Sequence, residues 1–278
     1  MSDSLMPWAW TDGRLVRIDA PVMPLSAPAL LRGEGIFETM ACVGGHPRLF
    51  DWHYERLARS ARALGLRLAL GPGALRKAVE ATLARNRVGE AAARVMLMRG
   101  ARRESVAVVC RRAARPGARE RSRGVALEVA PWRRAAGVPI HRHKTLAYWE
   151  CQRAREWAEG RGAFDALFLT PEGWVLEGGM TNVFCVRGGT VRTPPVSMGL
   201  LPGVMRRFVL AAARELYGLR AREERLTLRD LLEAEEVFVT NAVAGAVPVR
   251  RIGGRATRGG TTAAGAFQAA YEAAAEGN

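Results

Sequence analysis

The 278-residue sequence predicts an α+β protein of two domains, residues 1–115 and 116–278. Three observations predict this class. Strand and helix patterns alternate in the first part of the chain. The segment Arg112–Arg123 then carries Pro116, Gly117 and five arginines without a hydrophobic period, which is typical of a linker. After this segment the alternation starts again, and a chain of this length with 49% hydrophobic residues can bury a sizeable core.

The first domain is predicted to contain two β-hairpins, two helices and two further strands. Glycines between the hairpin strands favour tight turns. The paired strands are Trp8–Trp10 with Leu15–Ile18 and Ile36–Val43 with Pro47–Phe50. Asp51 is expected to cap a helix that runs to about Leu64, where Gly65 ends it. The remaining elements are the helix Leu75–Arg85 and the strands Ala93–Met98 and Ser105–Cys110.

The second domain is predicted to contain four strands and four helices. Its strands are short hydrophobic runs bounded by turn residues. The predicted strands are Val125–Ala130, Ala163–Leu169, Val183–Val186 and Val237–Thr240. The predicted helices are Tyr148–Glu159, Pro202–Tyr217, Leu228–Glu233 and Thr262–Ala274. Pro202 suits the first turn of its helix because a proline there sacrifices no hydrogen bond.

The net charge of +15 comes from 42 basic and 27 acidic residues, and only Lys77 and Lys144 among the basic residues are lysines. The arginines are scattered along the chain, and no aromatic residues interleave their densest stretch. We therefore do not expect nucleic acid as a partner. A site that selects an anionic small-molecule substrate uses the same positive field better.

The chain has no hydrophobic run of the length that a membrane span needs, and its N-terminus lacks the pattern of a secretory signal. The four cysteines are far apart in the sequence and form no Cys-x-x-Cys pair, which argues against a metal site and a disulfide framework. We therefore expect a cytoplasmic protein without a membrane partner or a bound metal.

Lys144 is the first candidate for chemistry. It lies in the basic cluster His141-Arg142-His143-Lys144, and neighbouring positive charge favours the neutral, nucleophilic form of an amine. The chain has forty arginines, so a lysine at position 144 indicates a task that arginine cannot perform. A guanidinium does not usefully deprotonate, whereas an amine does. From the local sequence alone, a basic surface patch with a chance lysine is the alternative.

Four other segments have features of a ligand site. Glu177 follows a short strand and precedes two glycines, so a ligand can approach the backbone closely. Arg56 shares a helix face with His53 and has the fork geometry that binds phosphate. The helix start within Leu200–Arg207 offers backbone N–H groups to an anion. The strand that ends at Thr240 runs into a loop, and such loops commonly line sites. Each feature alone is more typical of an ordinary turn, helix start or solvated arginine than of a site.

Together and in this order, these segments resemble the fold-type IV pyridoxal-phosphate enzymes. That family includes branched-chain and D-amino-acid aminotransferases and 4-amino-4-deoxychorismate lyase. The matching pieces are Gly33–Thr39, His53–Leu57, Lys144–Tyr148, Glu177–Phe184, Leu201–Arg206 and Glu236–Pro248. The resemblance implies a small N-terminal domain, a larger C-terminal pseudo-barrel domain that carries the lysine, and a homodimer with pyridoxal 5′-phosphate between the domains.

The resemblance also implies roles for three residues at the reacting end of the cofactor. Lys144 matches the lysine that binds the cofactor covalently and moves protons. Glu177 matches the carboxylate beside the pyridine nitrogen, which keeps the ring protonated so that it absorbs electrons. Tyr148 matches a tyrosine near the phenolic oxygen of the cofactor.

A second group of residues matches the phosphate end of the cofactor site. Arg56 matches the phosphate-binding arginine, and the backbone N–H groups of Val204 and Met205 complete that site by resemblance. Asn241 and Ala242 match a loop that touches the phosphate and the substrate. These assignments agree with the donors that a buried phosphate requires.

Two pairs of residues, Met205-Arg206 and Asn241-Ala242, resemble the lyase branch of the family. Aminotransferases of this fold more often have threonine at the position of Met205, and Gly-Thr or Ser-Thr near Asn241. The Arg-x-His pair of D-amino-acid transaminases is absent from Arg99–Glu104. Against the lyase, Ala147 replaces the usual asparagine, and Gly178-Gly179 departs from the common Gly-Ser or small polar pattern.

We expect a lyase of folate biosynthesis that converts 4-amino-4-deoxychorismate to 4-aminobenzoate and pyruvate. The first alternative is a class IV aminotransferase that acts on branched-chain or D-amino acids with a 2-oxo acid acceptor. The second is a non-catalytic basic binding protein.

Overall fold

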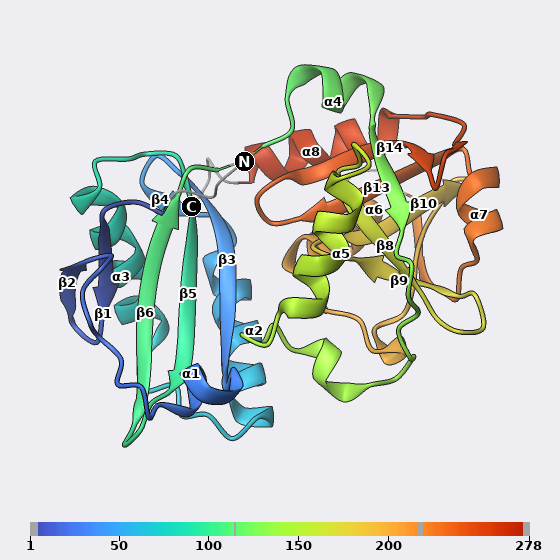
Figure 1. Cartoon of the computed structure of the whole chain (residues 1–278). Coiled ribbons are helices and arrows are strands. Elements are labelled where there is room, and N and C mark those ends of the chain that lie inside the picture. Colours follow the sequence, from blue (N-terminus) through green and yellow to red (C-terminus); the bar gives the residue numbers. More distant parts are fainter. Residues whose placement is uncertain (1–4, 114, 216–218, 275–278) are drawn as a thin grey trace. The chain divides into compact units, whose positions relative to one another are not determined.

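The computed structural model describes residues 5–113, 115–215 and 219–274 of the chain (Figure 1). Backbone contacts divide the protein into two compact units. The first unit consists of Met1–Ala114 and His143–Ala147, and the second of Arg115–Arg142 and Tyr148–Asn278. Among the described residues, no helix is both long enough and apolar enough to cross a membrane.

In the described part of the first unit, six strands form an antiparallel sheet in the order β2-β1-β6-β5-β3-β4. The strands are β1 (Trp8–Thr11), β2 (Arg14–Arg17), β3 (Gly35–Val43), β4 (His46–Pro47), β5 (Ala91–Arg99) and β6 (Glu104–Arg111). The helices are α1 (Pro28–Arg32), α2 (Phe50–Ala63) and α3 (Pro72–Arg85). Figure 1 shows α2 and α3 against one face of this sheet.

The core of the first unit lies between that face and the two helices. Successive side chains of a strand point to opposite faces, so every second residue of β3 and β5 reaches the core. Ile36 and Met40 of β3 and Leu97 of β5 are buried there with Leu57 of α2 and Leu83 of α3. The same alternation places Glu38 on the helix-covered face and Phe37 on the opposite face.

The second unit contains a mixed sheet, which in the described residues follows the order β12-β11-β10-β13-β14-β7-β8-β9, with β15 beside β14. The strands are β7 (Val125–Val129), β8 (Asp165–Leu169), β9 (Val175–Gly178), β10 (Asn182–Arg187), β11 (Thr190–Thr193), β12 (Arg220–Glu223), β13 (Glu236–Asn241), β14 (Gly245–Ile252) and β15 (Arg255–Ala256). Three neighbouring pairs are parallel, namely β11 with β12, β14 with β7, and β7 with β8.

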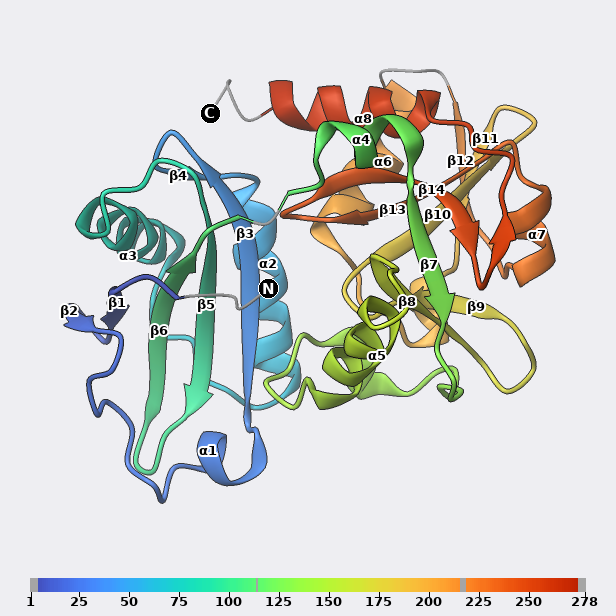
Figure 2. The ribbon, with the colours of Figure 1, turned by 45° about the horizontal axis from the view of Figure 1, so that its top comes forward.

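Helices and short turns cover the sheet of the second unit. They are α4 (Ala118–Arg123), α5 (Trp149–Glu159), α6 (Val204–Glu215), α7 (Leu228–Glu233), α8 (Thr262–Ala273) and the 3₁₀ turns η1 (Pro139–Arg142) and η2 (Val196–Met198). Figure 2 shows α8 along β13 and β14, and α5 beside β8. Alanines of α5 pack on Ala166 and Phe168 of β8, and their small side chains bring helix and sheet close together.

Most predicted elements lie within a few residues of their predicted bounds, and three predictions were wrong in detail. Phe50 begins α2 instead of ending a strand, and Leu49, with φ of 49°, is its N-cap in place of Asp51. The predicted linker contains helix α4, whose Glu120 side chain accepts a hydrogen bond from the Gly117 N–H at 2.7 Å. Helix α6 begins at Val204, after Pro202.

Several elements were not predicted, because their sequences lack a clear hydrophobic period: α1, β11, β12, β14 and β15. The predicted C-terminal end of the α6 helix at Tyr217 lies outside the described residues.

One segment departs from the predicted domains of residues 1–115 and 116–278. Lys144 was expected in the C-terminal domain, but His143–Ala147 belongs to the first unit. The reason is backbone pairing along the edge of β3. Phe37 N–H donates to the Lys144 carbonyl at 2.8 Å, Leu146 N–H donates to the Gly35 carbonyl at 2.9 Å, and Thr145 bridges Ile36.

Candidate active site

In the first unit, Lys144 lies against an aromatic ring that a second cation also contacts. Its Nζ is 4.3 Å from the ring centroid of Phe37, and the guanidinium carbon of Arg94 is 4.5 Å from the same centroid. The pairing of β3 with β5 places Arg94 opposite Thr39, on the face of the sheet to which Phe37 also points. The Phe37 ring thus stabilises two cations, each of which can pair with a carboxylate.

Arg94 was not predicted from the sequence. It lies within a strand of alternating buried residues, and nothing in its local sequence distinguishes it from other arginines. Only the pairing of β3, β5 and the Lys144 segment brings it near Phe37.

Arg56 belongs to a cluster of charged side chains buried between α2 and β3. Its Nε donates to Glu38 Oε1 at 2.7 Å and its Nη2 to Glu38 Oε2 at 2.6 Å. The His53 ring meets the same Oε2 through Nδ1 at 2.7 Å. All three side chains are almost fully buried, so the cluster fixes the guanidinium that the sequence predicts to bind phosphate.

The charges in this cluster change the pKa values of its members. Burial alone would raise the pKa of Glu38, but the charge and hydrogen bonds of Arg56, helped by His53, lower it from 4.5 to about 2. Burial lowers the pKa of His53; Glu38 opposes this effect, while the charges of Arg56 and Lys144 add to it. Glu38 is therefore a permanent anion and His53 favours its neutral form.

In the second unit, Glu177 lies at the end of β9 and is held on both carboxylate oxygens. Arg134 Nη1 donates to Oε1 at 3.1 Å. The Leu201 N–H at 3.0 Å and the Asn182 amide at 3.3 Å donate to Oε2. These donors stabilise the anionic form, which is the form that a protonated ring nitrogen requires as its partner.

Asp165 of β8 holds the chain that follows Glu177. It accepts hydrogen bonds from the Met180 N–H at 2.9 Å and the Thr181 hydroxyl at 2.8 Å. A Cβ at Gly178 would lie 2.5 Å from Asp165 Oδ2, and one at Gly179 would lie 2.9 Å from Oδ1. Both glycines are thus required for the close approach of this turn to β8. Burial raises the pKa of Asp165 to about 6, although these hydrogen bonds oppose the change.

Tyr148 lies beside the same turn. Its hydroxyl donates to the Gly179 carbonyl at 3.0 Å. Burial raises the pKa of the Tyr148 phenol well above its usual value, and Cys151, Glu177 and Asp165 raise it further. The phenol therefore keeps its proton and acts as a hydrogen-bond donor.

The start of α6 and the end of β13 lie on either side of Asn182. The pairing of β10 with β13 sets Asn182 opposite Thr240, and a Cβ at Gly203 would collide with the Asn182 side chain. Val204 and Met205, the first residues of α6, are buried. Within the described part of the chain, the buried Thr240 hydroxyl has no hydrogen-bond partner. A polar donor therefore remains available near the C-terminal end of β13.

Asn241 and Ala242 form the turn after β13. The Asn241 side-chain oxygen accepts hydrogen bonds from the backbone N–H groups of Val243 at 2.9 Å and Ala244 at 2.8 Å. The Ala242 carbonyl accepts one from the Tyr271 hydroxyl at 2.7 Å. Asn241 therefore shapes the turn with its side chain, which pairs the two backbone N–H groups that follow it.

The chemical groups described above suit the binding of pyridoxal 5′-phosphate. A buried anionic carboxylate suits the ring nitrogen, and a helix start beside an unpaired hydroxyl suits a phosphate. Of the predicted site residues, the second unit contains Tyr148, Glu177, Val204, Met205, Asn241 and Ala242, and the first unit contains Arg56 and Lys144. Each group of residues is held together inside its own unit.

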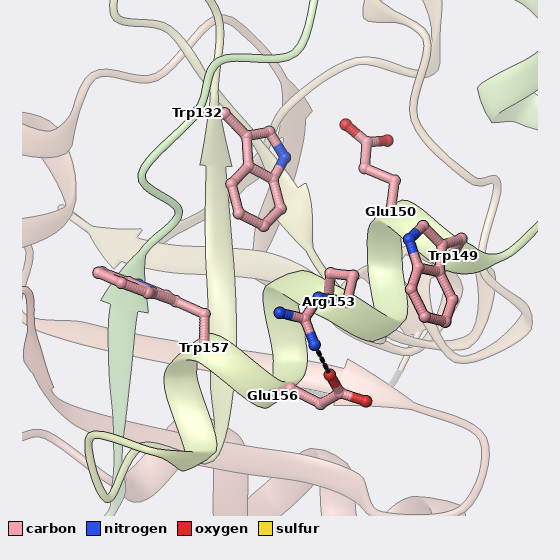
Figure 3. A pocket seen from close by; sticks show the side chains of 6 residues that line it. All are labelled: Trp132, Trp149, Glu150, Arg153, Glu156 and Trp157. Carbon is pink, nitrogen blue, oxygen red and sulfur yellow. Dashed lines mark hydrogen bonds and ion pairs between the residues drawn. The ribbon is translucent and has the colours of Figure 1, made fainter.

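A cavity of about 680 Å³ opens on another part of the second unit (Figure 3). It is lined by Trp132, Trp149, Glu150, Arg153, Glu156 and Trp157. None of the predicted site residues is among these six. One of them, Glu150, contacts Arg134, which in turn holds Glu177.

Comparison with known proteins identifies the class of this fold and site. A model of the amino-transferase class IV family matches residues 35–252, so the chain belongs to that family. A putative branched-chain-amino-acid aminotransferase from Methanocaldococcus jannaschii is 31% identical over 234 residues, with 81% of each chain covered. The aminodeoxychorismate lyase of Bacillus subtilis is 28% identical over 252 residues, with 87% of this chain and 86% of the relative covered.

Solved structures agree with this assignment. The T.th. branched-chain amino acid aminotransferase, solved with pyridoxamine 5′-phosphate, superimposes with a TM-score of 0.86 at 25% identity over 98% of this chain and 95% of that chain. The predicted α+β fold of type IV is thereby confirmed. The protein is an enzyme of this family, and its cofactor is pyridoxal 5′-phosphate.

We predict that Glu38→Gln lowers the free energy of unfolding by about 3–5 kcal/mol at neutral pH, because it leaves the buried Arg56 without a counter-ion. The pKa of Glu38 is lowered in the folded state, so its stabilising effect is present above the ordinary value of 4.5 and is lost as the pH falls towards 2. The difference between wild type and variant should therefore shrink with acidification. Urea unfolding at a series of pH values measures it.

Glu80→Gln is the matched control, since Glu80 also binds a histidine, His46, but at the surface. We expect little change from it. Equal losses in the two variants, or a loss in Glu38→Gln that does not depend on pH, would contradict the prediction.

Proposed function

We propose that the protein is a pyridoxal-phosphate-dependent lyase that converts 4-amino-4-deoxychorismate to 4-aminobenzoate and pyruvate. The observation that carries this proposal is the pair of structural elements at the phosphate end of the site, the Asn241-Ala242 turn and the α6 start with Met205. Ala242 offers a methyl group where aminotransferases of this fold more often have a hydroxyl. The Bacillus subtilis lyase among the relatives supports the same activity.

The cofactor, when bound, supplies a cationic ring that absorbs the electron pair left by a departing proton. In the proposed reaction the Lys144 amine would hold the cofactor and, as a free amine, would remove the proton from the substrate ring carbon that bears nitrogen. Glu177, fixed by Arg134 and Leu201, keeps the ring nitrogen protonated. The bond from the substrate ring to the enolpyruvyl oxygen breaks, and the substrate ring becomes the aromatic ring of 4-aminobenzoate. The released enolpyruvate takes up a proton and becomes pyruvate.

The remaining proposed roles concern binding. Arg56, held by Glu38, binds the phosphate together with the N–H groups of Val204 and Met205. Arg94 binds a substrate carboxylate, because its guanidinium lies against the same Phe37 ring as the Lys144 amine. Tyr148 lies near the phenolic oxygen of the cofactor.

A second candidate activity is amino-group transfer between an amino acid and a 2-oxo acid. The Methanocaldococcus relative, which is a putative branched-chain aminotransferase, favours it. Both activities need the same lysine, carboxylate and phosphate site, and they differ in whether the amine leaves with the product or stays on the enzyme.

Two assays separate these activities. For the lyase, we predict that the holoenzyme releases 4-aminobenzoate and pyruvate in equal amounts from 4-amino-4-deoxychorismate, measured by fluorescence and a coupled dehydrogenase. For the aminotransferase, L-leucine or D-alanine alone would convert the bound cofactor to its amine form and remove its visible absorbance. If no 4-aminobenzoate forms at high enzyme concentration and an amino acid converts the bound cofactor to its amine form, the lyase proposal is wrong and the enzyme is an aminotransferase.

We predict that Lys144→Ala folds normally but loses the cofactor link that borohydride reduces, because a covalent imine requires the amine. Mass spectrometry of the reduced protein measures the link. Lys77→Ala, which changes an exposed lysine on α3, should retain it in full. If Lys77→Ala loses the link and Lys144→Ala keeps it, the placement of the site is wrong.

We propose that the enzyme is a homodimer. The first unit exposes Leu25, Leu30 and Leu31, with 81%, 57% and 63% of their surfaces accessible, in and just before α1. Exposed clusters of large apolar side chains mark contact surfaces.

We predict that Leu30→Glu combined with Leu31→Glu shifts the sedimentation coefficient to that of a monomer, while Leu15→Glu, a change at another exposed leucine, does not. A wild-type monomer would refute the dimer.

We also propose a cytoplasmic location. The free thiols of Cys42, Cys110, Cys151 and Cys185 support it, since oxidising compartments favour disulfides.

A further inference from the structure

Arg134 connects two carboxylates in the second unit. Its Nη1 donates to Glu177 Oε1 at 3.1 Å, while its Nε at 3.1 Å and its Nη2 at 3.0 Å contact Glu150 Oε2 on the first turn of α5. The side chain is only 3% exposed, and its guanidinium lies 3.7 Å from the ring centroid of Phe168. The guanidinium is thus held from three sides and bound to both acids at once.

This arrangement has an electrostatic consequence at the carboxylate that faces the ring nitrogen. A guanidinium next to Glu177 keeps that acid charged, but its own positive charge opposes a second cation at the same place. Glu150 offsets this effect. One guanidinium between two carboxylates leaves a net negative charge on the three groups, whereas one guanidinium with Glu177 alone leaves none.

Glu150 is accessible in a way that Glu177 is not. Its side chain is 39% exposed and forms part of the tryptophan-lined cavity, where its carboxylate points away from the Arg153–Glu156 ion pair (Figure 3). His141 Nε2 lies 3.9 Å from the same Glu150 oxygen, and Cys151 Sγ accepts a hydrogen bond from Arg134 Nη2 at 3.4 Å. Glu150 is the carboxylate that balances Arg134 from the solvent side.

We propose that Glu150 is a positioning residue that acts through Arg134: it neutralises the guanidinium and fixes it, so that Glu177 presents an uncompensated negative charge to the ring nitrogen. The inference rests on the proposed use of Glu177 as the partner of that nitrogen. Glu150 itself touches neither cofactor nor substrate.

The experiment uses the holoenzyme with ¹⁵N-labelled pyridoxal 5′-phosphate. In Glu150→Gln we expect the ¹⁵N signal of the ring nitrogen to move towards that of the unprotonated ring, its deprotonation midpoint to fall by about one pH unit, and kcat to fall roughly tenfold with little change in KM. Glu150→Asp, which keeps the charge, should restore the signal towards wild type.

Glu156→Gln is the matched control, because Glu156 lies on the same helix and lines the same cavity but pairs with Arg153. It should leave the nitrogen signal and kcat unchanged. Identical signals in wild type and Glu150→Gln, equal shifts in the Glu150→Gln and Glu156→Gln variants, or failure of Glu150→Asp to differ from Glu150→Gln would overturn the inference. A wild-type protein that binds no cofactor would instead refute the proposed function.

Discussion

The second unit stabilises the charged form of one buried carboxylate, Glu177. Glu177 is almost fully buried, and burial alone favours the neutral form of an acid. The chain opposes this with a guanidinium, a side-chain amide and a backbone N–H, all supplied by different segments of the second unit. The close turn at Gly178-Gly179 and the Asp165 hydrogen bonds beneath it fix the strand end at which Glu177 lies. Much of the local structure thus serves one ionisation state.

The first unit also keeps a buried carboxylate charged, through the pair of Glu38 and Arg56. Glu38 and Arg56 are joined by two hydrogen bonds inside the core, with His53 on the shared oxygen. A buried ion pair seldom stabilises a fold more than well-packed apolar residues of similar volume would. Its presence beneath β3 is better explained by the need to hold one guanidinium in a fixed direction. Each unit therefore contains a buried arginine–glutamate pair, and the member that we propose to bind the cofactor is the arginine in the first unit and the glutamate in the second.

Local patterns predicted the elements of this fold better than the contacts of its site. The strands β1 and β2 could be predicted because a glycine turn separates two short apolar runs, and Lys144 could be singled out because lysine is rare in this chain. Arg94 and Arg134 could not, since contacts with segments distant in the sequence give them their neighbours. The same limit explains why the pairing of the Lys144 segment with β3 was not predicted. Lys144 joins β3 through backbone hydrogen bonds across a long sequence separation, and such pairing leaves no local signal.

The arginine-rich composition also has a structural explanation. Many guanidinium groups lie over aromatic rings, as Arg85 does over Trp8 and Arg161 does over Trp157, and others pair with acids along helices, as Arg155 does with Glu159. Planar, weakly hydrated and always charged, arginine suits stacking and pairing better than lysine does. What arginine cannot do is give up its proton at neutral pH. Of the two lysines in the chain, Lys77 is exposed on α3, which leaves Lys144 as the amine that we propose for that chemistry.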